Sequence, residues 1–290
     1  MTTDTNISSA ATAATSSPPL LNVDRLNVEF QTGDGVVKAV NGLSYSVDAG
    51  ETVAILGESG SGKSVNAQAV MGIIDTPPGR ITGGSIEYRG DDILKMSKEE
   101  QRKIRADHIA MVFQDALTSL NPVFTVGWQL SELFRQHRGL SKKEAKAKSL
   151  ELLDRVRIPG ARERIDSYPH EFSGGMRQRV MIAMGIALDP SVLIADEPTT
   201  ALDVTVQAQI MDLLKDLQDE TGMGLLLITH DLGVVAEVAD RVVVMYAGRE
   251  LEKGPLEPLY ASPSHPYTAG LMKSLPRHDV QLDRLEPITG

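Results

Sequence analysis

Short apolar runs alternate with longer amphipathic segments along most of this chain. The runs are rich in β-branched residues and apolar on both faces, which predicts strands buried within a sheet, at residues 51–56, 109–113, 191–195, 224–229 and 242–246. The amphipathic segments repeat apolar residues at helical spacing and predict helices at about 65–71 and 98–105, before Asp189-Pro190, and before Gly222. Strands that alternate with helices predict an α/β fold with a mostly parallel sheet.

The segments near the N-terminus follow another pattern. Residues 21–30 and 36–47 alternate in polarity, and the turn-forming sequence Thr32-Gly33-Asp34-Gly35 separates them. Residues 82–90 form a further strand-like segment that glycines bound at both ends. We therefore expect an antiparallel β subdomain beside the parallel sheet.

Residues 115–171 change character again. An apolar helix is predicted at 126–134, and Lys- and Glu-rich helices at 141–157. This pattern predicts an inserted helical subdomain with a small core. Its Lys/Arg run at 142–148 is interpreted as a solvated face rather than as a binding patch.

The two ends of the chain are poor in apolar residues. Residues 1–19 are mainly Thr, Ser, Ala and Pro, which predicts a disordered tail. Repeated prolines punctuate a C-terminal extension at 251–290, so the main domain is expected to span 20–250.

Composition narrows the class of protein. With 290 residues and 41% hydrophobic content, the chain can form one large domain with a subdomain. No apolar run is long enough to cross a bilayer and no signal-like segment begins the chain, so we expect neither export nor membrane spanning. The chain has no cysteine, which excludes disulfides, zinc–thiolate sites and iron–sulfur clusters. A net charge of −10 argues against a general nucleic-acid or anionic-lipid surface, so a polyanion must bind at a local site.

One motif supplies such a site, because Gly57-Glu58-Ser59-Gly60-Ser61-Gly62-Lys63-Ser64 matches the phosphate-loop pattern between a predicted strand and a predicted helix. Glycines let backbone N–H groups approach an anion, and the helix N-terminus adds its positive end. Lys63 is expected to reach the β- and γ-phosphates, and the Ser64 hydroxyl to bind Mg²⁺. The alternative, a glycine-rich turn without a ligand, would not require Lys-Ser after the last glycine. The predicted core is that of a P-loop NTPase.

Polar residues follow three predicted strands at the edge where open α/β sheets bind ligands. They are Gln114, the pair Asp196 and Glu197, and His230. Adjacent carboxylates after a buried strand need a cation, so we expect Asp196 to support Mg²⁺ and Glu197 to activate water. A lone Gln or His after a strand is more often solvated or structural, but the shared edge favours a functional role here.

Three weaker signals remain. Phe30 could stack on an adenine ring, and an ordinary packing role is equally compatible with its position. Ser173-Gly174-Gly175 starts a helix and could face an anion, although that tripeptide suits any helix-initiating turn. Asp203 precedes the next helix.

Taken together and in order, these motifs resemble the ATPase cassette of ABC transporters. The resemblance covers residues 20–250. It implies that ATP and Mg²⁺ bind at Lys63 and Ser64, that Gln114 contacts Mg²⁺ and the attacking water, and that Asp196 supports the metal. Glu197 would then be the catalytic base and His230 would contact the γ-phosphate. Phe30, Gly57, Ser59, Gly60, Ser61, Gly62 and Asp203 would join the nucleotide site.

The resemblance also implies partners. Ser173, Gly174 and Gly175 would complete the site of a facing cassette, so catalysis requires a dimer with a second copy or a sister ATPase subunit. The helical insertion would dock two membrane permease subunits at the cytoplasmic face of the cell membrane, and an extracytoplasmic solute-binding protein would act indirectly. No nucleic-acid partner is expected.

A narrower resemblance is to the ATPase subunits of oligopeptide and dipeptide importers, a group that includes nickel importers. It rests on segments 113–122, 172–179 and 265–276. Ala116 stands where the group usually has proline, and the cysteine-bearing C-terminal segment of many relatives is missing. The implied function is ATP hydrolysis that powers peptide import; the alternatives are import of nickel or another small solute, or a soluble ABC ATPase without a permease.

Overall fold

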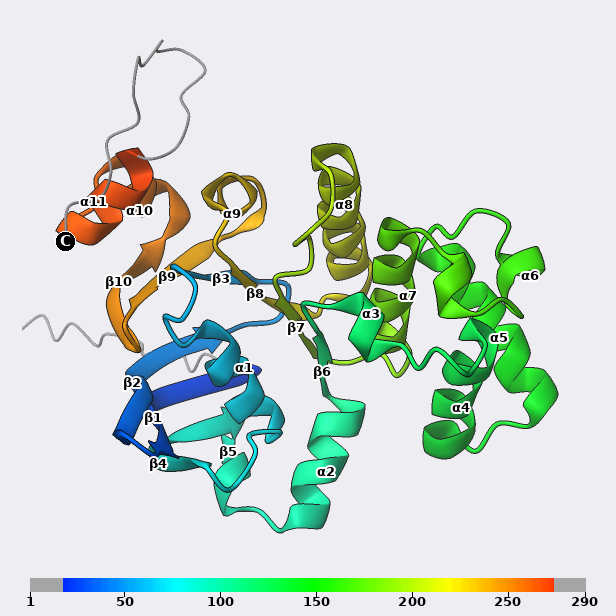
Figure 1. The fold of residues 1–290 in the computed structure, drawn as a ribbon, viewed down its shortest axis with the longest axis horizontal. Coiled ribbons are helices and arrows are strands. Elements are labelled where there is room, and N and C mark those ends of the chain that lie inside the picture. The colour runs from blue at the N-terminus through cyan, green and yellow to red at the C-terminus, as the bar shows by residue number, and fades with distance from the viewer. Residues whose placement is uncertain (1–17, 274–290) are drawn as a thin grey trace, which may run out of the picture.

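The computed structural model describes residues 18–273. The predicted disordered tail therefore lies almost entirely outside the described residues, as does the end of the predicted extension from residue 274 onward. Within 18–273, no helix is both long enough and apolar enough to cross a membrane. Figure 1 shows an antiparallel sheet below a central sheet, with α4 to α6 at the opposite end of the molecule from α10 and α11.

The central sheet has six strands in the order β10-β9-β3-β8-β7-β6. These strands are β3 (Thr52–Leu56), β6 (Ile109–Val112), β7 (Val192–Asp196), β8 (Gly224–Thr229), β9 (Arg241–Tyr246) and β10 (Arg249–Pro255). All neighbours pair in parallel except β10, which runs antiparallel to β9 at the sheet edge. The predicted α/β fold with a mostly parallel sheet is confirmed. Every residue of β3, β7 and β8 is buried, as expected for strands covered on both faces.

The N-terminal strands form the predicted antiparallel subdomain, in the order β2-β1-β4-β5. Its elements are β1 (Leu21–Thr32), β2 (Gly35–Val47), β4 (Gly79–Tyr88), β5 (Asp91–Asp92) and the short 3₁₀ helix η1 (Ile93–Lys95). The hairpin turn lies where the sequence predicts it, because Thr32 pairs with Gly35.

Helix α1 (Lys63–Met71) packs between the two sheets. Ala67, Ala69 and Val70 share one buried cluster with residues of β1 and β2 and with Val53 and Ile55 of β3. Small residues on α1 let the helix lie close to both sheets. Helix α2 (Lys98–Asp107) begins with a capping box between Ser97 and Glu100 and leads into β6.

The opposite face of the sheet carries α7 (Gly174–Ile186) and α8 (Val204–Thr221). The inserted helices are α3 (Ala116–Ser119), α4 (Val126–Arg138), α5 (Lys142–Arg155), α6 (Ala161–Arg164) and the 3₁₀ helix η2 (Pro169–Glu171). The insertion does not pack on a small core of its own, because Leu130 and Leu153 belong to one large buried cluster with Ile182 of α7 and Leu214 of α8. Pattern alone missed this because α7 is apolar on more than one face.

The C-terminal part adds α9 (Leu232–Val238), α10 (Leu256–Ala261) and α11 (Pro266–Lys273). They cover the face of β3 and β9 that carries Ala54, Leu56 and Val244. The predicted domain boundary at residue 250 falls inside β10, which the sequence pattern did not reveal. An edge strand with the sequence Arg-Glu-Leu-Glu-Lys-Gly-Pro lacks the apolar run that marks the buried strands.

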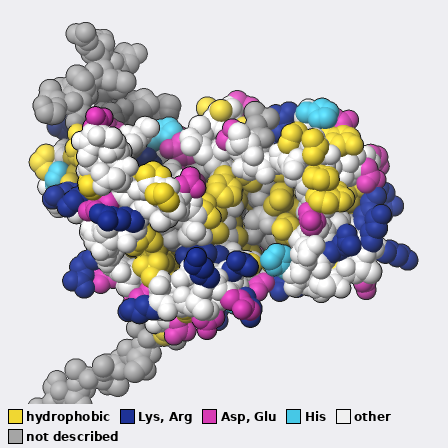
Figure 2. Space-filling model, turned by 60° about the horizontal axis from the view of Figure 1, so that its bottom comes forward, with side chains coloured by type: hydrophobic (Ala, Val, Ile, Leu, Met, Phe, Trp, Pro, Cys, Tyr) yellow, Lys and Arg dark blue, Asp and Glu magenta, His cyan; other side chains and the backbone are white. Residues whose placement is uncertain are grey.

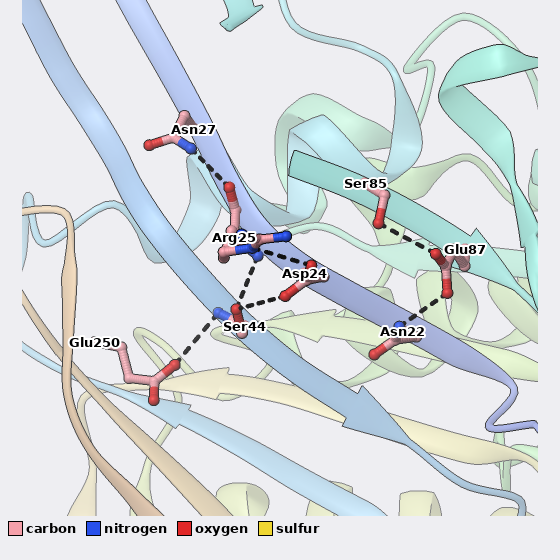
Figure 3. A network of polar contacts seen from close by, with 8 residues as sticks. All are labelled: Asn22, Asp24, Arg25, Asn27, Ser44, Ser85, Glu87 and Glu250. Atoms are coloured by element: carbon pink, nitrogen blue, oxygen red, sulfur yellow. Dashed lines mark hydrogen bonds and ion pairs between the residues drawn. The ribbon is translucent and has the colours of Figure 1, made fainter. Parts of the chain in front are cut away.

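Strand β10 also ties the central sheet to the antiparallel one. Figure 3 shows the backbone N–H of Ser44 in β2 donating to Glu250 of β10, at 3.3 Å. The side-chain hydroxyl of Ser44 accepts from the backbone N–H of Arg25 at 2.8 Å and donates to Asp24 at 3.4 Å, at a point where the pairing of β1 is irregular. Lys253 of β10 donates to the carbonyl of Ser44 at 2.9 Å. Strand β10 is thereby fixed by both sheets.

Candidate functional site

The loop between β3 and α1 follows a path that only glycine allows at two points. A Cβ atom at Gly57 would collide with the carbonyl oxygen of Met245, and one at Gly62 would collide with that of Ala39. Gly62 also has a φ of 99°, in the left-handed region that favours glycine. The loop is thus held against two neighbouring segments with its backbone exposed toward a cavity, as binding of an anion by N–H groups requires.

Lys63 lies folded against this loop. Its Nζ atom donates to the carbonyl oxygens of Gly57 at 2.7 Å and of Glu58 at 2.9 Å, and the side chain is 4% exposed. Burial lowers the pKa of Lys63, while the carboxylates of Glu197 and Asp196 oppose this shift. A buried ammonium whose hydrogen bonds go to backbone carbonyls is well placed to bind an incoming phosphate. The hydroxyl of Ser61 is buried without a hydrogen-bond partner among the described residues, and Ser61 does not line the cavity described below, so its predicted contact with nucleotide stays a prediction.

Two oxygen-bearing side chains meet at the start of α1. The Ser64 hydroxyl donates to Oδ1 of Asp196 at 3.1 Å, and Asp196 is buried. Burial raises the pKa of Asp196, with a further contribution from the Glu197 carboxylate. Within 18–273, no group of three or more His, Asp or Glu side chains could hold a metal by itself. A hydroxyl and a carboxylate fit Mg²⁺, which would then take its remaining ligands from phosphate and water.

Glu197 is the centre of a polar network immediately after β7. Its Oε2 atom accepts hydrogen bonds from Nε2 of Gln114 and from the hydroxyl of Thr200, both at 2.9 Å. Its Oε1 atom lies 3.3 Å from Nδ1 of His230 and 4.0 Å from Nζ of Lys63. The backbone of Glu197 has a φ of 46°, an uncommon conformation for a residue with a side chain. The neighbouring strand β8 holds it there, because the backbone N–H of Glu197 donates to the carbonyl of Ile228 in β8 at 2.8 Å.

A cavity of about 650 Å³ joins these groups. The predicted residues on its wall are Gly57, Ser59, Gly60, Gly62, Lys63, Ser64, Gln114, Glu197 and His230. The sequence analysis did not identify Ala39, Thr200 and Leu271, which also line it. Thr200 could have been found, because a hydroxyl three residues after the paired acids can hydrogen-bond back to them. Nothing in the sequence pattern brings Leu271 here.

Other predicted residues lie elsewhere. The structure does not bring Phe30 to the cavity wall: its partly buried ring lies close to Gly79 of β4 and packs at the edge of the core, so adenine stacking stays a prediction. Ser173 caps α7 by accepting from the N–H of Met176 at 3.3 Å, and Asp203 caps α8 by accepting from Val206 at 3.0 Å. Neither is on the cavity wall.

These two helix starts lie against each other. The position of a Cβ atom at Gly174 would be 3.6 Å from Leu202, and one at Gly175 would press on Val206 at 2.6 Å. Gly174 and Gly175 are therefore packed closely on the segment that begins α8. Ser173, Gly174, Gly175 and Asp203 thus form a second group of predicted site residues, which lies outside the cavity wall.

Comparison with known proteins matches two family models. Residues 40–200 match the model described as ABC transporter, and residues 251–290 match the model described as oligopeptide/dipeptide transporter, C-terminal region. The second match extends beyond the described residues.

Similar curated proteins have related names. A Brucella abortus (strain 2308) protein, named as a peptide import ATP-binding protein, is 53% identical over 272 residues, which cover 94% of this chain and 82% of that protein. The oligopeptide transport ATP-binding protein OppD of Bacillus subtilis (strain 168) is 52% identical over 257 residues, which cover 89% of this chain and 72% of that protein. Among solved structures, a dimeric ATP-binding cassette in a post-hydrolysis state with ADP and phosphate matches with a TM-score of 0.72 and 29% identity. That match covers 82% of this chain and 99% of the cassette.

Proposed function

The chain belongs to the ABC transporter family, and from this we propose that it is the ATP-hydrolysing subunit of an importer for peptides. The names of its relatives support peptide import rather than the nickel alternative. The single observation that carries the catalytic part is the convergence of Lys63, Glu197, Gln114 and His230 on one cavity.

Each of these side chains has a role that follows from its surroundings. Lys63 and the loop N–H groups bind the β- and γ-phosphates of ATP, since they supply a buried cation beside exposed amide donors. Glu197 accepts the proton of the attacking water. Gln114 and Thr200 already occupy one of its oxygens, which leaves Oε1 for water and for contact with His230.

Mg²⁺ belongs to the proposal through the residues that fit it. Ser64 and Asp196 would hold the ion, with Gln114 near it at the same sheet edge. When bound, the ion neutralises charge on the phosphate oxygens during phosphoryl transfer. The hydrogen bond from Ser64 to Asp196 holds both side chains where they would bind the ion.

Ser173, Gly174, Gly175 and Asp203 have no place in the cavity of their own chain, so they are proposed to complete the cavity of a facing subunit. The dimeric cassette among the structural relatives supports this arrangement. A site divided in this way is complete only when two ATPase subunits meet, either two copies of this chain or this chain and a sister cassette.

We also propose that permease subunits dock on the hydrophobic surface around α3 and α4, which would place the chain at the cytoplasmic face of the membrane. Val123, Phe124 and Trp128 are exposed there, and the rings of Phe124 and Trp128 stack with centroids 3.9 Å apart. A groove of about 260 Å³ with Phe113, Leu133 and Met184 on its wall lies close by. Figure 2 shows hydrophobic side chains gathered in a hollow across the middle of the face it displays. An apolar surface of this kind suits a membrane-protein partner.

The experiment that tests the function is expression of the chain with the membrane proteins encoded beside it, followed by purification and reconstitution in lipid vesicles. The complex should hydrolyse ATP faster when peptide and its solute-binding protein are supplied. Nickel-dependent stimulation without a response to peptides would instead support the alternative substrate. ATP hydrolysis that no membrane protein alters would support a soluble ATPase.

A further inference from the structure

The C-terminal helix α11 forms part of the wall of the nucleotide cavity. Leu271 lines this cavity together with Lys63 and His230. It is an apolar side chain among mostly polar neighbours, and it comes from a segment that follows the last strand of the central sheet. Leu271, Tyr267 and Met272 also pack against the buried cluster that contains Leu56, the residue before the phosphate loop.

Strand β10 anchors the start of this helix. The carboxylate of Glu252 accepts from the N–H of Ser264 at 2.7 Å and from the N–H of His265 at 3.0 Å. Nδ1 of His265 in turn accepts from the N–H of Tyr267 at 3.1 Å. Burial raises the pKa of the Glu252 carboxyl, but several hydrogen bonds, with the largest effect from the N–H of Ser264, together outweigh burial and lower this pKa below its ordinary value. The sequence Ser264-His265-Pro266-Tyr267 is therefore a capping device that sets the position of α11.

Further contacts fix α11 and its neighbour α10 beside the catalytic loops. The ring of Tyr267 lies 4.7 Å from that of Tyr246 at the end of β9, and burial together with the nearby Glu58 carboxylate raises the pKa of Tyr267 to about 12. The hydroxyl of Tyr260 donates to the carbonyl of Leu232 at 2.9 Å, at the start of the helix that follows His230. The extension thus touches both the phosphate loop and the segment after His230.

From these contacts we infer that α11 is a nucleotide-dependent wall of the ATP site: Leu271 packs against bound nucleotide, and nucleotide binding and docking of α11 stabilise each other. The inference rests on the proposed function, because it takes ATP as the ligand. If Leu271 contacts the ligand only when α11 is docked, linkage requires that the ligand favour the docked helix by the same factor. Glu252 is then a positioning residue, which acts through α11 and not by contact with ATP.

The first test compares two substitutions on one helix. ATP binding to the full chain is measured by calorimetry without Mg²⁺, which prevents turnover. Leu271→Ala should weaken ATP affinity by about 3- to 10-fold, the scale of one lost apolar contact. Met272 packs on the same cluster but does not line the cavity, so Met272→Ala is the matched control. Its ATP affinity should stay within about twofold of that of the parent. Leu271→Met keeps apolar volume and should bind ATP like the parent.

Three outcomes would overturn the inference, and one would overturn the function beneath it. If Leu271→Ala and the parent bind ATP equally well, Leu271 does not contact the nucleotide. If Leu271→Ala and Met272→Ala weaken ATP binding equally, the effect comes from general packing. Thermal unfolding of each variant shows whether it folds. If Leu271→Ala has a folding defect, ATP binding by Leu271→Met and the exchange test below test the inference instead. A parent chain that fails to bind ATP contradicts the proposed function itself.

The second test measures the coupling directly by amide hydrogen exchange on the parent chain. ATP should slow exchange in residues 266–273 as well as in the phosphate loop; unchanged exchange in 266–273 is the third overturning outcome. Glu252→Gln should reduce that protection and weaken ATP affinity. In a Leu271→Ala background, Glu252→Gln should weaken ATP affinity less than it does in the parent, since both changes act through one docked helix.

Discussion

The side-chain amide of Gln114 donates a 2.9 Å hydrogen bond to Oε2 of Glu197, although the two residues are 83 positions apart in the chain. Register explains the meeting. Strands β6 and β7 are parallel neighbours with Val112 opposite Ala195, so both strands deliver their following residues to the same sheet edge. The loop that continues into the proposed permease-docking surface is thereby hydrogen-bonded directly to the proposed catalytic carboxylate.

The first prediction concerns this bond. Gln114→Ala should lower the rate of ATP hydrolysis by roughly 10- to 100-fold, because Glu197 loses one of the two donors that orient it. ATP affinity should stay within about threefold of the parent, since the phosphate loop is unchanged. Steady-state ATPase assays and equilibrium binding give the two numbers. A rate like the parent's would show that Thr200 alone suffices to orient Glu197.

Sequence predicted the framework of the site well because burial and strand order leave few alternatives. Residues 224–229 were predicted as an interior strand and form β8 without change of bounds, since an apolar run of that length fits only a strand covered on both faces. Asp203 was placed before a helix, and it caps α8. The strand ends then bring Gln114, Glu197 and His230 together, as parallel pairing requires.

The parts that sequence missed depend on contacts between distant segments. Strand β10 is polar and gains its place by pairing with β9. Leu271 reaches the cavity from α11, whose start is held by hydrogen bonds to Glu252 of β10. Phe30 shows the converse: an aromatic residue at a suggestive position packs beside Gly79 and does not line the cavity. Local pattern carries no information on such long-range packing.

The second prediction is that Lys63→Ala weakens ATP binding roughly 10- to 100-fold, the range for loss of charge-assisted hydrogen bonds in a buried site. The side chain is 4% exposed, so water replaces the ammonium poorly. Equilibrium binding of ATP measures the change, with thermal unfolding as the control for folding. If the variant matched the parent in ATP affinity and turnover, Lys63 would not contribute to the ATP site.

The third prediction tests whether two chains share each site. Lys63→Ala and Ser173→Arg should each be inactive alone. If the dimer consists of two copies, a 1:1 mixture should recover up to about a quarter of the parent rate, because about half of the dimers are mixed and each mixed dimer keeps one intact site. Permeases must be present so that dimers form. No recovery would indicate that the partner is a sister cassette or that one chain suffices.

The fourth prediction concerns the exposed aromatic pair. Phe124→Glu should leave ATP binding by the isolated chain intact, because Phe124 does not line the cavity. It should abolish stimulation of ATP hydrolysis by the permease, since a charge in an apolar interface remains unpaired. Val123→Glu should act in the same way, because Val123 is 69% exposed and has little packing to lose. If a variant lost both ATP binding and stimulation by the permease, the substitution would have caused misfolding.

The last prediction concerns Glu197 as the base. Glu197→Gln keeps the shape of the side chain, and its amide oxygen can still accept from Gln114 and Thr200, while the basic carboxylate is lost. Hydrolysis should fall by roughly 10² to 10⁴, the range for loss of a general base. ATP binding should survive because the phosphate loop and Lys63 are unaltered.

The same variant should also change the oligomeric state. Unhydrolysed ATP would lie between Lys63 of one subunit and Ser173 of the facing one, so it binds the closed dimer and not the separated subunits, and mass action favours the dimer. Light scattering should therefore show an ATP-dependent dimer, either of the variant with itself or with a co-purified sister cassette. Omission of Mg²⁺ blocks residual turnover, and Lys63→Ala in the same background should stay monomeric with ATP. Hydrolysis at the parent rate would exclude Glu197 as the base, whereas loss of hydrolysis without dimer formation would leave the base in place and contradict only the shared site.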